Sequence, residues 1–157
     1  MRFESFTPFL GHSLMNDEFE ERFVHSGLKL QPSGGDPTIF AKSADEGFVL
    51  GFNSSPAFEE FFPFAPKTPG AYILVSIYGE PGKSELPFEL DWELSLDQLQ
   101  SRLGEPKKIL AANATFLHDG LHVVCRFRDK TMQRMQSATL SLVDVYALQR
   151  YGLQSKG

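Results

Sequence analysis

Residues 95–106 read SLDQLQSRLGEP, and this stretch carries the signals that begin and end a helix. Ser95 followed three residues later by Gln98 forms a capping box, which pairs free backbone N–H groups at a helix start. The leucines of the stretch fall on one apolar face: Leu96, Leu99 and Leu103. Gly104 can adopt the left-handed conformation that closes a helix, and Pro106 prevents its continuation. The sequence therefore predicts a helix that buries its leucines.

A second stretch with a matching apolar pattern lies near the start of the chain. Residues 16–24 read NDEFEERFV and place Phe19 and Phe23 where the later helix has Leu99 and Leu103. A hairpin pattern follows each helix. It covers residues 38–52 in the first half and residues 114–127 in the second, where Asp119 and Gly120 form a two-residue turn.

A third strand is expected after each hairpin, because LVSIY at residues 74–78 matches LVDVY at residues 142–146. The order helix, strand, strand, strand thus occurs twice. We expect an α+β protein in which residues 1–157 form a single domain. Two tandem repeats, approximately residues 11–79 and 85–147, each place a helix on a three-stranded antiparallel sheet and share one core.

The segment that joins the repeats, residues 85–94, reads ELPFELDWEL and alternates apolar residues with carboxylates. Alternation of this kind predicts an extended ribbon with two different faces. The apolar residues are expected to seal the seam between the repeats. Glu89, Asp91 and Glu93 are then left facing either water or a basic partner.

Composition narrows the classes of protein. Residues 1–106 hold 7 Lys/Arg and 17 Asp/Glu, whereas residues 107–157 hold 8 and 3. The acidic part argues against general nucleic-acid binding and suits a basic protein partner, although the two parts could instead attract each other within the fold. One cysteine excludes an intrachain disulfide, and we identify neither a signal peptide nor a membrane span. We therefore expect a cytoplasmic protein.

Catalytic and metal sites find little support in the sequence. Cys125 falls on the apolar side of its strand, which is typical of a buried structural cysteine. His118 and His122 flank the predicted turn, but a zinc site needs three or four ligands and no third one is nearby. Carboxylates two positions apart on a strand lie about 7 Å apart, and no partner converges on them. We expect no catalytic residue, no metal and no cofactor.

A sheet face with mixed polar and aromatic character is a second candidate surface for a partner. Tyr, Arg and His residues bury much area and still form hydrogen bonds, as interface hot spots require. This face either binds a partner or packs against the other repeat. With the acidic ribbon, the predicted partner-binding residues are Glu89, Asp91, Glu93, Tyr78, His122, Arg126, Asp144 and Tyr146.

The pattern from Leu86-Pro-Phe88 to Leu103-Gly-Glu-Pro106, followed by an aromatic strand and a glycine-turn hairpin, resembles bacterial immunity proteins of polymorphic or type VI secreted toxins. The repeated helix-then-sheet order is also similar to the tandem-repeat β-lactamase inhibitor protein and to small outer-membrane assembly lipoproteins. The sequence lacks the lipid-bearing cysteine of the latter. The resemblance implies a non-enzymatic protein that binds and blocks a partner.

The expected function is therefore that of an immunity-type inhibitor that occludes the active site of a cognate bacterial toxin or effector. The alternative is an adaptor or chaperone-like module that binds a protein without inhibiting it. In either case the partner is a protein, not nucleic acid or membrane, and the chain acts as a monomer or homodimer.

Overall fold

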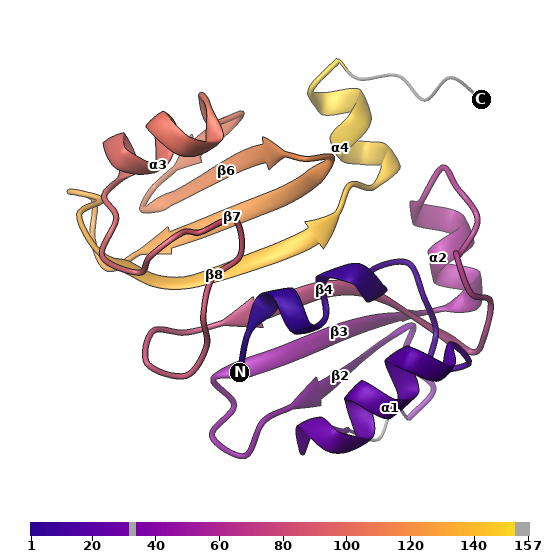
Figure 1. The fold of residues 1–157 in the computed structure, drawn as a ribbon. Helices are drawn as coiled ribbons and strands as arrows, with labels where there is room; N and C mark the ends of the chain where they lie inside the picture. The colour runs from indigo at the N-terminus through magenta and orange to yellow at the C-terminus, as the bar shows by residue number, and fades with distance from the viewer. Residues whose placement is uncertain (32–33, 153–157) are drawn as a thin grey trace.

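One eight-stranded antiparallel sheet forms the centre of the molecule, in the order β1-β2-β3-β4-β8-β7-β6-β5 (Figure 1). The computed structural model describes residues 1–31 and 34–152. In the first half of the chain the strands are β1 Lys29–Leu30, β2 Thr38–Lys42, β3 Phe48–Ser54 and β4 Tyr72–Gly79. In the second half they are β5 Lys108–Leu110, β6 Asn113–His118, β7 Leu121–Phe127 and β8 Met135–Leu142.

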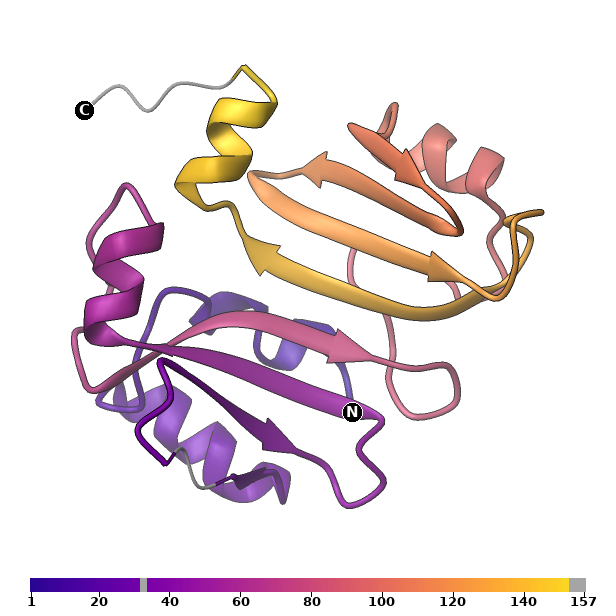
Figure 2. The same cartoon turned by 180° about the vertical axis from the view of Figure 1, so that it is seen from behind.

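Helices lie on both sides of this sheet, but unequally. Their bounds are η1 Phe3–Ser5, η2 Thr7–Phe9, α1 Asp17–Ser26, α2 Ser55–Phe61, α3 Leu96–Leu103 and α4 Val145–Arg150. The two 3-10 turns, α1 and α3 lie on one face, in front of the strands in Figure 1 and behind them in Figure 2. We call this the helix-covered face. The short helices α2 and α4 stand together at one end of the sheet.

The two predicted long helices are confirmed, and so is the capping box predicted for the second. Ser95 accepts a hydrogen bond from Gln98 N and the Gln98 side chain accepts one from Ser95 N, so the capping box at α3 is complete. Asn16 caps α1 by a single bond, which its side chain accepts from Phe19 N. Gly27 follows α1 in the left-handed conformation, which glycine adopts without the steric cost that other residues have.

The main core fills the space between the sheet and the helix-covered face. Phe19 of α1 and Leu99 of α3 are both fully buried in it. Phe3 and Phe6 from the N-terminal turns pack on Phe48 of β3, with ring centroids 5.8 and 6.0 Å apart. Both halves of the chain contribute to one continuous cluster. A smaller cluster under α2, on the other face, contains Phe58, Phe62, Ile73 and Val75.

The hairpin turn at Asp119 and Gly120 is confirmed, and both residues have positive φ, as a two-residue turn of this kind requires. The prediction of a third strand at residues 142–146 is wrong. Strand β8 ends at Leu142, Asp144 caps α4 by accepting from Ala147 N, and Tyr146 lies within that helix. Strand β8 takes its place next to β4.

The ribbon ELPFELDWEL is not extended either. Residues 85–94 form a chain of turns in which Phe88 and Glu89 have positive φ. Leu86, Leu90 and Leu94 are nevertheless buried in the main core, while Glu89, Asp91 and Glu93 are exposed. The leucines are therefore buried and the carboxylates exposed, as expected, but a series of turns separates them and not an extended strand.

Strands β4 and β8 join the first four strands to the last four. Four residue pairs connect them, from Ser76–Ser141 to Gly79–Ala138, whereas the neighbouring pair β7 and β8 has seven. We call the β4–β8 pairing the seam. The structure is one continuous sheet rather than two separate three-stranded units, and it does not by itself establish a duplication.

Candidate functional site

Among the described residues, the face of the sheet opposite α1 and α3 has helices only at one end, formed by α2 and α4 (Figure 2). We call it the open face. Residues directly opposite each other in an antiparallel ladder point to the same side, so the register of the sheet identifies its members. Tyr78 pairs with Thr139, Thr139 with Val124, and Val124 with Thr115. These four side chains form a row across four strands.

A second row lies closer to α2 and α4. Ser76 pairs with Ser141, Ser141 with His122, and His122 with Leu117. All members of the two rows are half-buried: none is exposed and none is fully buried. The open face therefore offers a firm surface of hydroxyl, aliphatic and aromatic groups.

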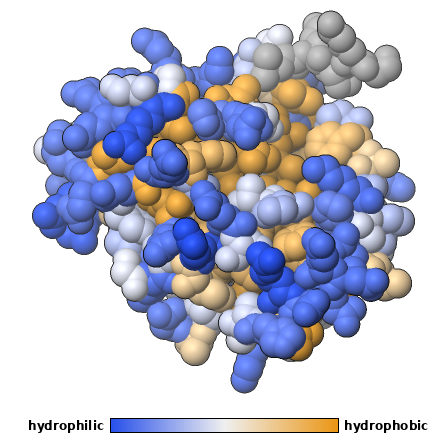
Figure 3. All heavy atoms as spheres, in the orientation of Figure 1, coloured by the Kyte–Doolittle hydropathy of each residue, from blue (hydrophilic) through white to orange (hydrophobic). Residues whose placement is uncertain are grey.

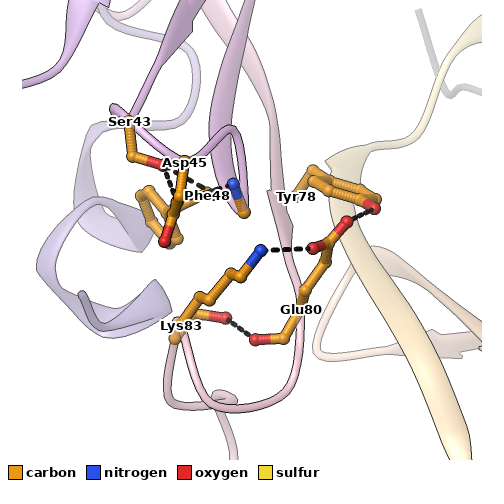
Figure 4. A network of polar contacts seen from close by, with 8 residues as sticks. Ser43, Asp45, Phe48, Tyr78, Glu80 and Lys83 are labelled. Carbon is orange, nitrogen blue, oxygen red and sulfur yellow. Dashed lines mark hydrogen bonds and ion pairs between the residues drawn. The ribbon is translucent and has the colours of Figure 1, made fainter.

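Tyr78 is oriented by a hydrogen bond to a neighbouring carboxylate (Figure 4). Its hydroxyl donates to Glu80 Oε2 over 2.6 Å, and Lys83 Nζ lies 3.4 Å from the other oxygen of that carboxylate. Burial first, and then the adjacent Glu80 carboxylate, raise the pKa of the Tyr78 phenol. The hydroxyl therefore remains protonated and positioned at neutral pH.

His122 lies in the second row beside a cavity of about 330 Å³. The floor of this cavity is formed by Thr115, His122 and Val124, and α4 contributes Ala147 and Arg150 to its wall. The remaining lining residues are Lys108, Leu110, Asn113, Asp144 and Tyr151. Burial lowers the pKa of His122, so the imidazole is neutral at pH 7.

The other predicted residues of this surface lie around the same rows. Arg126 is exposed and pairs with Ser137, on the open face of β7. Asp144 is half-buried and serves as the cap of α4, with Oδ1 2.8 Å from Ala147 N. Tyr146 is 54% exposed, and its ring lies 6.1 Å from that of Phe61, which links α4 to α2.

The three predicted acidic residues do not belong to this surface. Their loop passes over the helix-covered face, in front of β7 and β8 in Figure 1 and behind them in Figure 2. There they line a depression of about 760 Å³ with Trp92, whose Nε1 donates to Ser84 O over 2.7 Å. Glu93 also pairs with Arg134 at 3.4 Å. The eight predicted residues thus divide between opposite faces.

The helix-covered face also carries an apolar area. Figure 3 shows apolar side chains gathered over β6 to β8, beside α4. Leu121 and Leu142 lie opposite each other here and are partly buried, as is Phe88 of the acidic loop. Phe88 packs edge-on against His118 with ring centroids 4.7 Å apart. This area is continuous with the main core.

The geometry argues against the residues considered for catalysis. Leu117 pairs with His122 and His118 with Leu121, so the two histidines point to opposite faces and cannot bind one ion. In the part of the chain that the structure describes, no three His, Cys, Asp or Glu residues are grouped as metal ligands. Cys125 is 1% exposed, and burial raises the pKa of its thiol to about 12.

Several residues of the open face have no counterpart among the sequence predictions. Thr139 and Ser141 belong to β8, and Lys108 and Arg150 line the cavity beside His122. The alternation in ATLSL at residues 138–142 is a signal that would have found the strand, and Asp144 three residues before Ala147 is one that would have found the helix cap. Across residues 1–31 and 34–152, no helix has the length and apolar character needed to cross a membrane.

No protein-family model matches the sequence, and comparisons with curated proteins and with solved structures gave no match.

Proposed function

We propose that the protein is a non-enzymatic, immunity-type inhibitor that acts in the cytoplasm, and that the open face binds a cognate bacterial toxin or effector. The observation that carries this proposal is the pair of half-buried rows across β4, β8, β7 and β6. A sheet face without a covering layer normally has charged side chains that keep it in water. Here hydroxyl, aliphatic and aromatic groups take that position.

Rigidity supports the use of this face for binding. Its side chains stand on paired strands, so little conformational entropy is lost when a partner orders them. Tyr78 and Arg126 are the residue types that most often dominate interface energies. The helices α2 and α4 limit the surface at one end, which would fix the orientation of the partner.

The inhibitory form of the proposal comes from the resemblance to immunity proteins, and one experiment separates it from the adaptor alternative. The neighbouring gene product is expressed alone and together with this protein. Toxicity that disappears on co-expression supports an inhibitor. A partner that binds but is harmless when expressed alone supports the adaptor or chaperone-like module.

The location of the contact is tested with a matched pair of substitutions. Val124→Asp places a charge in the centre of the open face, and Val24→Asp places one on the outer side of α1, where Val24 is 66% exposed. We expect the first to reduce affinity at least tenfold and the second to leave it unchanged. Equal affinities of both variants, with unchanged circular dichroism, contradict the open face as the contact.

A basic partner attracted by Glu89, Asp91 and Glu93 remains a separate proposal, because these carboxylates lie on the other side of the molecule. Reversing all three charges should slow association at low salt if the loop contributes to encounter. An association rate independent of these charges would limit recognition to the open face.

We also propose that the two halves arose by duplication. The strand order supports this, since β1 to β4 and β5 to β8 each run inward from an edge to the seam. The helix α1 before β1 and the helix α3 before β5 hold corresponding places.

A further inference from the structure

His122, which lines the cavity beside α4, carries a polar atom that is buried and unsatisfied. His122 Nε2 has no hydrogen-bond partner and is, within the described residues, the one buried side-chain nitrogen or oxygen of this kind. A buried polar group without a partner is unfavourable, because it has lost water and gained nothing in return. A ligand that supplied an acceptor would remove this penalty, so the atom marks a position where binding is favourable.

The charges around the cavity indicate which acceptor fits. Lys108 from β5 and Arg150 from α4 contribute two positive charges to its lining. Asp144 is the acidic member of the lining, and its Oδ1 already accepts from Ala147 N. Among the described lining residues the balance of charge is positive, which favours an anionic group over a neutral amide or a cation.

Size and lining further restrict the ligand. A cavity of about 330 Å³ is at the lower end of the volumes that hold small molecules. Leu110, Val124 and Ala147 provide apolar contacts for a short aliphatic stem. A carboxylate on such a stem is the side chain of glutamate.

From these observations, we propose that the cavity receives a glutamate side chain of the protein partner, whose carboxylate accepts from His122 Nε2 between Lys108 and Arg150. This rests on the proposed function in that the glutamate belongs to the docked partner. It adds the chemistry of one contact on the open face. The neutral His122 then carries its proton on Nε2, because only that tautomer can donate to the carboxylate.

Tyr151 packs against the imidazole beside the cavity, and we expect its ring to turn aside when a ligand reaches Nε2. The Tyr151 ring lies edge-on to the imidazole with centroids 5.4 Å apart, and it also lines the cavity. Tyr151 follows α4 directly, and its side chain can turn aside without breaking the sheet. The partner carboxylate would replace an aromatic contact with a charge-assisted hydrogen bond, which is the stronger of the two.

The test uses N-acetyl-L-glutamate amide as the probe, titrated into the isotope-labelled protein and followed by NMR at His122, Thr115 and Val124. We expect saturable shifts at these residues with a dissociation constant of about millimolar, as befits a ligand of this size. N-acetyl-L-glutamine amide, N-acetyl-L-lysine amide and inorganic phosphate serve as comparison ligands. Binding of the glutamine amide or of phosphate as strong as that of the glutamate probe contradicts a carboxylate site.

Two variants assign the contact. His122→Phe retains an aromatic ring but removes the donor, and the double variant Lys108→Ala with Arg150→Ala changes exposed side chains that leave the fold intact. Each variant should lower the affinity for the probe at least tenfold. Unchanged affinity in the double variant overturns the proposal whether or not His122→Phe folds.

Because the probe is used without the partner, failure of this site is distinguishable from failure of the proposed function. If the protein protects against the toxin but does not bind the probe, the open face stands as the binding surface and the glutamate contact is contradicted. If the protein binds the probe but captures no partner, the carboxylate site in the cavity is supported and the inhibitor function is contradicted.

Discussion

Ile77 of β4 lies directly opposite Leu140 of β8, and both side chains are buried on the helix-covered face. This pair is the apolar centre of the seam. The seam has four paired positions, so side-chain burial at Ile77 and Leu140 must supply a large share of the free energy that holds the halves together.

Leu140→Ala should therefore destabilise the whole molecule. A cavity at a fully buried leucine costs about 2–5 kcal/mol in the free energy of unfolding. Urea unfolding followed by Trp92 fluorescence and by circular dichroism measures this, and the two signals should change together if both halves unfold as one unit. Thr139→Ala, one residue away on the open face, is the control with an expected loss below about 1 kcal/mol. Separate transitions for the two signals would show that the halves unfold independently.

The complete capping box predicts a specific cost for the loss of Ser95. Ser95→Ala leaves Gln98 N without its acceptor at the start of α3, and we expect the free energy of unfolding to fall by about 1 kcal/mol. Ser101→Ala, on an exposed position of the same helix, should change it by less. An equal effect of both substitutions would show that the cap contributes nothing beyond helix propensity.

Cys125 should not react with thiol reagents in the folded protein. The thiolate is the reactive form, and burial raises the pKa of this thiol to about 12. Labelling at pH 8 should therefore be slow and should accelerate in urea in proportion to the unfolded fraction. Fast stoichiometric labelling of the native protein would contradict the buried, structural role.

Stability should fall as the pH is lowered from about 7.5 to 5.5. Burial lowers the pKa of both His12 and His122 in the folded state, whereas the unfolded chain titrates near the ordinary value of about 6.5. The unfolded state thus binds more protons below this value, and acidification favours it. Urea midpoints across this range measure the effect.

His122→Gln should flatten this pH dependence, because the replacement does not titrate. Ser101→Ala, which removes no titrating group, is the control and should leave the slope unchanged. A slope that is the same in all three proteins would assign the acid sensitivity to other groups.

Local signals in the sequence predicted the helices and the hairpin, because caps and two-residue turns depend on a few neighbouring residues. The residue set of Ser95, Gln98 and Gly104 defines α3 without help from the rest of the fold. Strand β8 escaped prediction because its buried positions include Met135, Ala138 and Leu140, a set without β-branched or aromatic residues.

The two errors have a common physical origin. The segment ELPFELDWEL alternates as a strand does, but Leu86, Leu90 and Leu94 can also be buried by successive turns, and Pro87 with positive φ at Phe88 favours turns. LVDVY at residues 142–146 has strand propensity, yet Asp144 caps a helix once tertiary contacts bury Ala147. Periodicity alone does not distinguish these outcomes.

The candidate site could be predicted only in part. Strand alternation correctly places Tyr78, His122 and Arg126 on one face of the sheet, and their role in binding stays a prediction. Lys108 and Arg150 come from β5 and α4, which meet His122 only after the sheet has formed. Their convergence is a property of long-range pairing, and no local pattern encodes it.

The sheet ends in very short strands, with two residues in β1 and three in β5. Such edges offer few free backbone groups, so they are poor templates for the addition of another strand. Recognition through backbone pairing would be insensitive to most substitutions, whereas recognition through the open face depends on individual side chains. A scaffold of this kind can change its partner by exchanging a few surface residues while every backbone hydrogen bond of the sheet remains in place.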